Sequence, residues 1–282
     1  MRLGGPVFVD SMTPDRWVAA LQANGYGAAY CPVTVKDDAS TRSAYVQAAE
    51  AAGIVIAEVG AWSNPLSPDP EERARALAHC QAQLALADEV GARCCVNIAG
   101  SRGQPWDGPH PQNFTSETFD MIVESVRAII DAVRPTRTYY TLEPMPWMYP
   151  DSADSYLALL RAIDRERFAV HVDVVNVVNS PRRYYDNTSL IREWFSKLGP
   201  YIRSCHAKDT RLSTKLTTHL DEVRPGLGNL DYRTLLVEIE RVDPELTLMI
   251  EHLHDPEDYR LSADYIRGVA HEVGVSLRPF ES

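Results

Sequence analysis

Four side chains that commonly bind metal ions lie in the second halves of apolar segments rich in β-branched residues. They are Glu143 in segment 138–144, Asp173 in 168–176, His206 in 201–209 and Glu251 in 246–253. Three carboxylates brought together repel one another, and burying each without a partner is costly. A divalent cation removes both penalties. Because three carboxylates and one imidazole make a mostly oxygen ligand set, the pattern predicts one divalent ion, Mn²⁺ first and Mg²⁺ or Co²⁺ as alternatives.

Each of these residues taken alone also has an ordinary structural explanation. A glutamate at a strand end often caps a helix or forms a salt bridge. Asp173 is the hardest to explain in this way, because it lies inside an otherwise apolar run. His171 shares the parity of Asp173 but lies deeper in the strand, so we expect a hydrogen-bonded core histidine there. The five cysteines show no CxxC spacing, which argues against a zinc ribbon and favours free thiols.

Further polar and aromatic side chains fall at or near the ends of the expected strands, where a substrate would meet them. The candidates for substrate binding are Trp62, Asn97, Trp147, Asn176, Lys208 and Arg211. Tryptophan rings can stack on the apolar faces of sugars. Lys208 has an alternative explanation, because it could instead pair with Asp209 or Glu251. The aromatic group around Trp147 indicates a ligand larger than a triose or tetrose.

Eight short β-branched segments alternate with amphipathic segments along the chain. The expected strands are 7–10, 28–33, 54–62, 92–99, 138–144, 168–176, 201–209 and 246–253. Alternating strands and helices require crossover connections, and hence a parallel sheet. Because no linker interrupts the pattern, we predict an α/β protein with a single (β/α)8 TIM barrel over 1–282, in which chemistry lies at the carboxyl ends of the strands. An open doubly wound sheet is the alternative, although no GxGxxG motif follows any expected strand.

Net charge and hydropathy limit the partners of the chain. The 282 residues carry a formal charge of −11 and give a pI of about 5.2, which argues against binding nucleic acid or an anionic membrane surface. No segment approaches the roughly 18 apolar residues of a membrane helix, and the amino terminus lacks a signal-peptide pattern. We therefore expect a cytoplasmic protein that acts on a small molecule.

Several short motifs together resemble those of the xylose isomerase-like superfamily of sugar isomerases and epimerases. They are Leu142-Glu143-Pro144, Asp173-x-x-Asn176, His206-x-Lys208-Asp209 followed by Arg211, the segment PGLGNLDY, and Ile250-Glu251-His252. The resemblance implies a TIM barrel whose Glu, Asp, His and Glu ligands hold one divalent metal, with Glu143 and Glu251 as the acid and base. It also implies a homo-oligomer, either a dimer or a tetramer. Asn176 departs from the pattern, because the epimerases usually carry a substrate-contacting histidine at that position.

The expected substrate is a sugar or sugar derivative with a carbonyl group. The predicted reaction removes a proton beside the carbonyl through a metal-stabilised enediolate, and returns one to the opposite face (epimerase) or to the adjacent carbon (isomerase). Loss of a β-substituent would instead make the protein a dehydratase or lyase of an oxidised sugar or glycoside. Two other classes stay open: an abasic-site endonuclease, which the charge of −11 opposes, and a sugar-binding module without activity.

Overall fold

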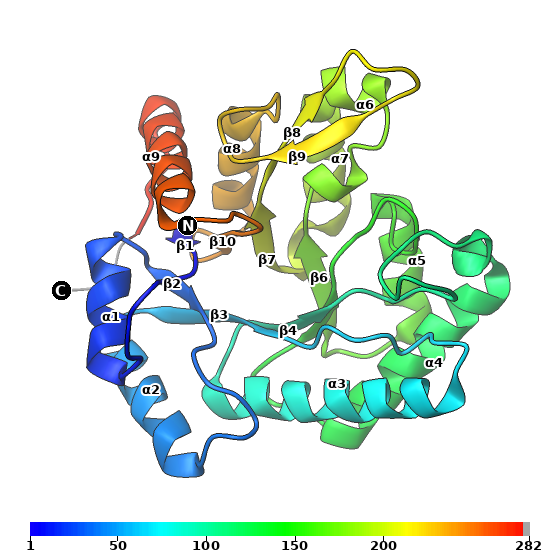
Figure 1. The fold of residues 1–282 in the computed structure, drawn as a ribbon, viewed down its shortest axis with the longest axis horizontal. Helices are drawn as coiled ribbons and strands as arrows, with labels where there is room; N and C mark the ends of the chain where they lie inside the picture. Colours follow the sequence, from blue (N-terminus) through cyan, green and yellow to red (C-terminus); the bar gives the residue numbers. More distant parts are fainter. Residues whose placement is uncertain (279–282) are drawn as a thin grey trace.

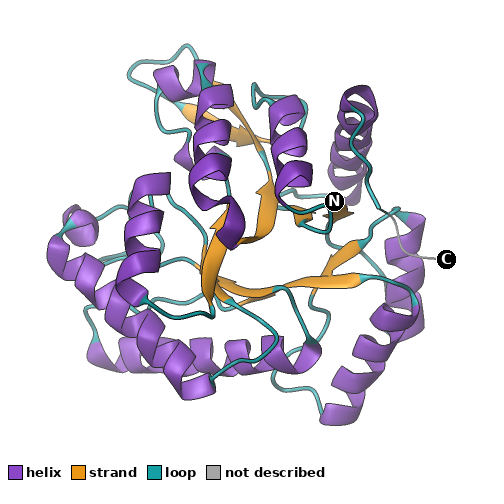
Figure 2. Cartoon of the chain, turned by 180° about the vertical axis from the view of Figure 1, so that it is seen from behind, coloured by secondary structure: helices purple, strands orange, loops and turns teal. Residues whose placement is uncertain are grey.

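Eight parallel strands close into a barrel, and helices cover its outer face (Figures 1 and 2). The computed structural model describes residues 1–278. Around the barrel the strands follow the order β1-β10-β7-β6-β5-β4-β3-β2. The barrel strands are β1 (Arg2–Gly4), β2 (Ala28–Tyr30), β3 (Val55–Gly60), β4 (Cys94–Asn97), β5 (Tyr140–Leu142), β6 (Phe168–Val172), β7 (Ile202–Ala207) and β10 (Thr247–Ile250). The helices are α1 (Pro14–Ala23), α2 (Ala39–Ala51), α3 (Pro70–Val90), α4 (Ser116–Val133), α5 (Ala153–Ile163), α6 (Pro181–Tyr185), α7 (Asn187–Leu198), α8 (Tyr232–Val242) and α9 (Pro256–Val273). The predicted (β/α)8 barrel is confirmed.

The first strand lies earlier than the sequence pattern suggested. The prediction of a strand over 7–10 is wrong, because β1 comprises Arg2–Gly4 and the expected segment is a loop. Gly4 allows a close approach of neighbouring strands, since a Cβ there would lie 2.5 Å from the Ala28 carbonyl oxygen. The apolar residues after it pack elsewhere: the Phe8 ring centroid lies 5.7 Å from that of Tyr259.

The carboxyl ends of β5 and β6 are tied to helix α5 by one buried hydroxyl. The Tyr156 hydroxyl donates to the Leu142 carbonyl oxygen at 2.7 Å, and it accepts from the backbone N–H of Leu142 at 3.0 Å and of His171 at 3.3 Å. These bonds fix the backbone directly before Glu143 and two residues before Asp173. The helix layer therefore positions two of the predicted metal ligands.

An additional antiparallel ribbon follows β7, and the sequence pattern did not predict it. It consists of β8 (Asp209–Leu212) and β9 (Leu220–Val223), and it projects beyond the barrel in Figure 1. The Asp209 carboxylate anchors the base of the ribbon by accepting backbone N–H bonds of 2.8–3.1 Å, from Thr210, Gly226, Gly228 and Leu230.

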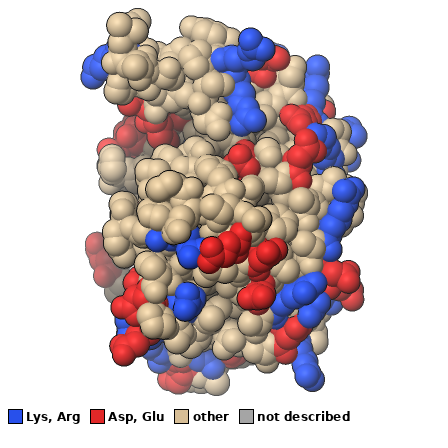
Figure 3. Space-filling view, turned by 90° about the vertical axis from the view of Figure 1, so that its right-hand side faces the viewer, with Lys and Arg blue, Asp and Glu red and all other residues tan. Residues whose placement is uncertain are grey.

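Acidic and basic side chains are interspersed on the face of the molecule shown in Figure 3. All five cysteines are free thiols, as predicted. Among the helices of residues 1–278, none has the length and apolar character needed to cross a membrane.

Candidate functional site

The four predicted metal ligands come together at one end of the barrel. Their strands β5, β6, β7 and β10 are consecutive neighbours, and Glu143, Asp173 and Glu251 each directly follow the last residue of a strand, while His206 lies near the end of β7. One potential ligand atom from each side chain lies within 4.8 Å of the others. Glu143, Asp173 and His206 are buried and Glu251 is partly buried. The closed barrel thus brings together four residues that span 108 positions of the sequence, from Glu143 to Glu251.

The imidazole of His206 connects this cluster to a second buried carboxylate. Its Nδ1 atom lies 2.8 Å from Glu251 Oε1 and 3.3 Å from Glu143 Oε1. Its Nε2 atom lies 3.0 Å from Glu58 Oε2, on the opposite edge of the ring. The other oxygen of Glu58 lies 3.0 Å from His171 Nε2. His171 is therefore a hydrogen-bonded core histidine, as predicted.

Glu58 of β3 is a site residue that the sequence analysis missed. It is 1% exposed, and the Ser204 hydroxyl also donates to its Oε1 atom. Burial by itself would raise the pKa of Glu58, but His206 and His171 outweigh burial and lower it below the usual range. The signal was present in the sequence, because Glu58 interrupts the apolar run IVIAEV just as Asp173 interrupts its own strand.

Lys208 extends into the same cluster and contacts all three carboxylates. Its Nζ atom lies 2.6 Å from both Asp173 Oδ2 and Glu251 Oε1, and 3.3 Å from Glu143 Oε1. The expected alternative for this lysine, an ion pair with Glu251, is therefore present. Its role in substrate binding stays a prediction. The Asn176 amide also belongs to the cluster, because it donates to Glu143 Oε1 at 2.9 Å.

Charges within the cluster strongly shift its protonation equilibria. Burial alone would raise the pKa of Glu143 and of Glu251, but Lys208 and His206 outweigh it and lower each pKa to about 2. Burial and the neighbouring Glu143 raise the pKa of Asp173. Burial disfavours the charged forms of His206 and Lys208, yet the carboxylates raise both pKa values well above their ordinary range. The chain itself thus supplies two cations against three carboxylates, and a metal ion that binds His206 must release its proton.

A cavity of about 390 Å³ opens directly onto this cluster. It is lined by Glu143 and Asn176 together with Trp62, Trp106, Trp147 and His252. Of the predicted substrate-binding residues, Trp62, Trp147 and Asn176 therefore face this cavity. Lys208 lies behind it, where its Nζ atom is 3.4 Å from both Asn176 Oδ1 and His252 Nδ1.

Two predicted substrate-binding residues lie away from this cavity. Asn97 is fully buried, and its side-chain amide donates to Cys80 Sγ of helix α3 at 3.4 Å and to the Ser63 carbonyl oxygen of the loop after β3 at 3.2 Å. Because side chains alternate along a strand, the position of Asn97 directs it to the helix layer and not to the barrel mouth. Arg211 lies exposed on strand β8 of the ribbon. Neither residue lines the cavity, so their assignment to substrate binding stays a prediction that this geometry does not support.

Glu58→Gln is expected to weaken Mn²⁺ binding about 10- to 100-fold, because a carboxylate beside a ligand histidine fixes the ring orientation and raises its basicity. The amide is similar in shape but can accept from only one of the two imidazoles. Mn²⁺ titration followed by electron paramagnetic resonance measures the change. Glu257→Gln, an exposed glutamate on α9, is the matched control. Unchanged affinity in Glu58→Gln would show that Glu58 does not support His206.

Comparison with known proteins identifies the group to which this barrel belongs. The family model described as xylose isomerase-like TIM barrel matches residues 18–269. The chain belongs to the xylose isomerase-like TIM barrel family. The predicted resemblance is therefore confirmed. No curated protein sequence matches this family member significantly.

Solved structures with this fold have several different activities. D-psicose 3-epimerase with D-tagatose from Clostridium cellulolyticum is 14% identical, with a TM-score of 0.71 over 97% of this chain and 99% of that chain. A xylose isomerase-like TIM barrel protein from Mycobacterium smegmatis in complex with magnesium is 16% identical, with a TM-score of 0.66 over 93% of this chain and 90% of that chain. Endonuclease IV from Thermus thermophilus is 13% identical, with a TM-score of 0.73 over 96% of this chain and 100% of that chain. At these identities the similarity establishes the fold alone.

Proposed function

We propose that this member of the xylose isomerase-like family is a divalent-metal-dependent isomerase or epimerase of a sugar or sugar derivative. The observation that carries the proposal is the cluster of Glu143, Asp173, His206 and Glu251, whose potential ligand atoms lie within 4.8 Å of one another. This cluster opens onto a cavity with aromatic walls, which suits the apolar faces of a sugar. Family membership supports the same substrate class.

The donor set fits a small divalent cation. Three carboxylates and one imidazole match the preferences of Mn²⁺, and also accommodate Mg²⁺ or Co²⁺. Asp173 Oδ2 and Glu251 Oε1 are buried, and neither accepts a hydrogen bond of normal angle from the described residues. Both oxygens already face a cation, the Lys208 ammonium at 2.6 Å. When bound, the metal ion supplies Lewis acidity toward the carbonyl oxygen of the substrate.

The two glutamates are placed to exchange protons with a substrate from two sides. Glu143 follows β5 and Glu251 follows β10, and these strands flank β6 and β7 in the barrel. Because Lys208 and His206 lower the pKa of each to about 2, both side chains are carboxylates in the metal-free protein at neutral pH, the form that a proton acceptor needs. The Asn176 amide holds Glu143 in orientation through its 2.9 Å bond. Epimerisation requires one glutamate to accept the proton as a carboxylate, while the other, having taken up a proton from solvent through the open cavity, returns it to the opposite face.

Metal removal tests this proposal. The protein is treated with a chelator, then restored with Mn²⁺, and incubated in heavy water with ketoses, aldoses and 3-oxo-glycosides. We expect deuterium to enter one substrate at the carbon beside its carbonyl, and the rate to fall at least 100-fold after chelation and to return with Mn²⁺. Exchange that a chelator leaves unchanged would contradict the metal dependence. Release of water or of an aglycone would identify a dehydratase or lyase, the alternative reaction of the same site.

A further inference from the structure

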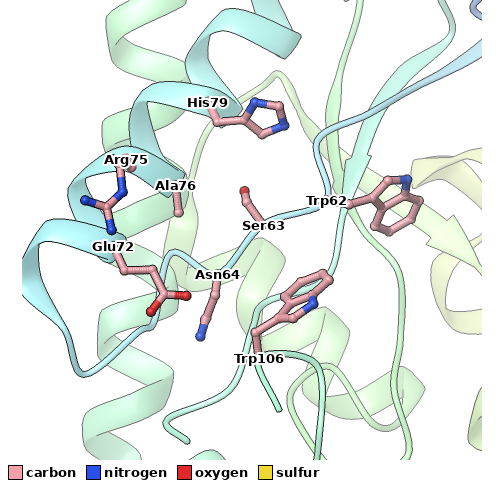
Figure 4. Close-up of a pocket in the computed structure, with 8 residues that line it drawn as sticks. All are labelled: Trp62, Ser63, Asn64, Glu72, Arg75, Ala76, His79 and Trp106. Atoms are coloured by element: carbon pink, nitrogen blue, oxygen red, sulfur yellow. The ribbon is translucent and has the colours of Figure 1, made fainter. Parts of the chain in front are cut away.

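A second hollow lies beside the substrate cavity, between the first turns of helix α3 and the loop after β3 (Figure 4). Its volume is about 420 Å³. Trp62 and Trp106 line both this hollow, which we call the α3 groove, and the cavity that reaches Glu143. The α3 groove therefore adjoins the candidate active site, and the two indole rings lie at the boundary between them.

The position of Trp62 depends on the residue two places before it. Its indole lies against the backbone at Gly60, where a Cβ atom would lie 2.4 Å from the indole nitrogen. Only glycine leaves room for the ring in this position. Trp62 is nevertheless 44% exposed, so that the tryptophan is held in place while part of its ring stays open to a ligand. A fixed, partly exposed aromatic ring is a suitable surface for stacking.

The polar side chains of the α3 groove divide into fixed and available groups. Ser63 and Asn64 already form hydrogen bonds within the protein. The Ser63 hydroxyl donates to the Ala61 carbonyl oxygen at 2.9 Å, and the Asn64 amide donates to the Ser101 carbonyl oxygen at 2.9 Å. Helix α3 contributes Glu72, Arg75 and His79 on the other side (Figure 4).

These three helix residues retain hydrogen-bonding capacity. Glu72 accepts the Ser67 hydroxyl through Oε2 alone. Among residues 1–278, Arg75 forms an ion pair only with the exposed Glu71, at 3.6 Å. His79 is exposed on the surface of the helix. One carboxylate and one guanidinium make the groove close to neutral, which favours a neutral ligand rich in hydroxyl groups over an anion.

We propose that the α3 groove is a subsite for a second sugar ring, so that the substrate is a glycoside of at least two rings. The inference rests on the proposed function of the neighbouring cavity. A ring with its reacting carbon near Glu143 occupies the cavity, and a ring linked to it passes the two tryptophans into the groove. There its C–H face meets an indole, while its hydroxyls meet Glu72, Arg75 and His79. This arrangement combines aromatic stacking with a few well-placed polar groups, as ligand sites generally do.

A larger side chain that fills the α3 groove tests the proposal by a change in sugar affinity, so that no catalytic turnover is needed. The probes are D-glucose and its disaccharides cellobiose and maltose, and saturation-transfer NMR titration of the Mn²⁺-loaded protein gives each Kd. We expect at least one disaccharide to bind about tenfold more tightly than glucose. His79→Trp fills the groove and is expected to remove this advantage while leaving the Kd of glucose unchanged. Ala78→Trp adds the same bulk at an exposed neighbouring position outside the groove, and it should preserve the advantage.

A smaller change in the groove gives an independent readout. Arg75→Ala removes a hydrogen-bond donor and should raise the disaccharide Kd about fivefold, with glucose unaffected. Equal affinity of the unmodified protein for glucose and both disaccharides would overturn the proposed subsite. So would a His79→Trp variant whose affinity for glucose and for the disaccharides falls by the same factor. Failure of the proposed function shows differently, as absence of deuterium exchange while the size-dependent binding persists.

Discussion

Glu143→Gln and Glu251→Gln are each expected to lower deuterium exchange into the substrate at least 1,000-fold. Glutamine keeps the size of the side chain but cannot accept a proton, and loss of a general base typically costs about 10²–10⁴ in rate. Each change also removes one negative donor from the cluster within which all ligand atoms lie inside 4.8 Å. The two effects act in the same direction, so that this is among the largest losses expected for this protein.

Measuring metal content together with exchange separates these two effects. Each variant is loaded with excess Mn²⁺, its bound metal is determined, and the exchange rate is expressed per bound ion. If the replaced glutamate acts as acid or base, the exchange rate per bound ion stays far below that of the unmodified protein. If it acts only as a metal ligand, the rate per bound ion is close to normal. The matched control is Glu257→Gln on the outer helix α9, whose side chain is 63% exposed. Full exchange in either active-site variant would remove that glutamate from the proposed mechanism.

The convergence of the four donors was predictable because one rule sets their positions. In a closed parallel barrel, the carboxyl ends of all strands meet at the same end. A polar residue near the end of an apolar run therefore meets its counterparts from neighbouring strands if its side chain points inward. Glu143, Asp173, His206 and Glu251 follow this rule, and their strands are adjacent in the order predicted for a TIM barrel.

The departures from prediction come from details that this rule does not fix. Asn97 is the last residue of strand β4, and its side chain points outward to Cys80 of α3, whereas the side chains one position before and after it alternate to the other face. The first strand has three residues, too few to show an alternating pattern of its own. Glu58 interrupts an apolar run, but its role depends on His171 and His206, which lie on β6 and β7 more than 100 positions further along the chain.

The central place of Lys208 could not be predicted from spacing either. Its parity showed that it faces inward with His206, but the length and flexibility of the side chain leave its end undetermined. Only the structure shows that the ammonium group reaches past His206 to Asp173, Glu143 and Glu251. The same cluster therefore contains the proposed metal ligands and a cation tethered to the chain.

Lys208→Met is expected to tighten Mn²⁺ binding about 10- to 100-fold. The Lys208 ammonium lies 2.6 Å from Asp173 and from Glu251, so that it competes with a metal ion for the same oxygens. Two unit charges about 4 Å apart interact with roughly 4 kcal/mol at an effective dielectric constant of about 20. Since a tenfold change in affinity corresponds to about 1.4 kcal/mol, removal of even part of this repulsion gives the expected range. Methionine retains the length and the apolar stem of lysine while removing the charge.

Thermal unfolding provides a second and opposite readout of the same change. In the presence of chelator, Lys208→Met should unfold at a lower temperature than the unmodified protein, because three buried carboxylates lose a compensating cation. Saturating Mn²⁺ should restore most of the difference, since tighter binding to the folded state adds stability. Lys197→Met is the control: this partly exposed lysine pairs with Asp154 and Glu193 on the outer surface, and the change alters net charge equally. If Mn²⁺ affinity in Lys208→Met is unchanged or weaker, the ammonium group does not compete with the metal ion but helps to organise its ligands.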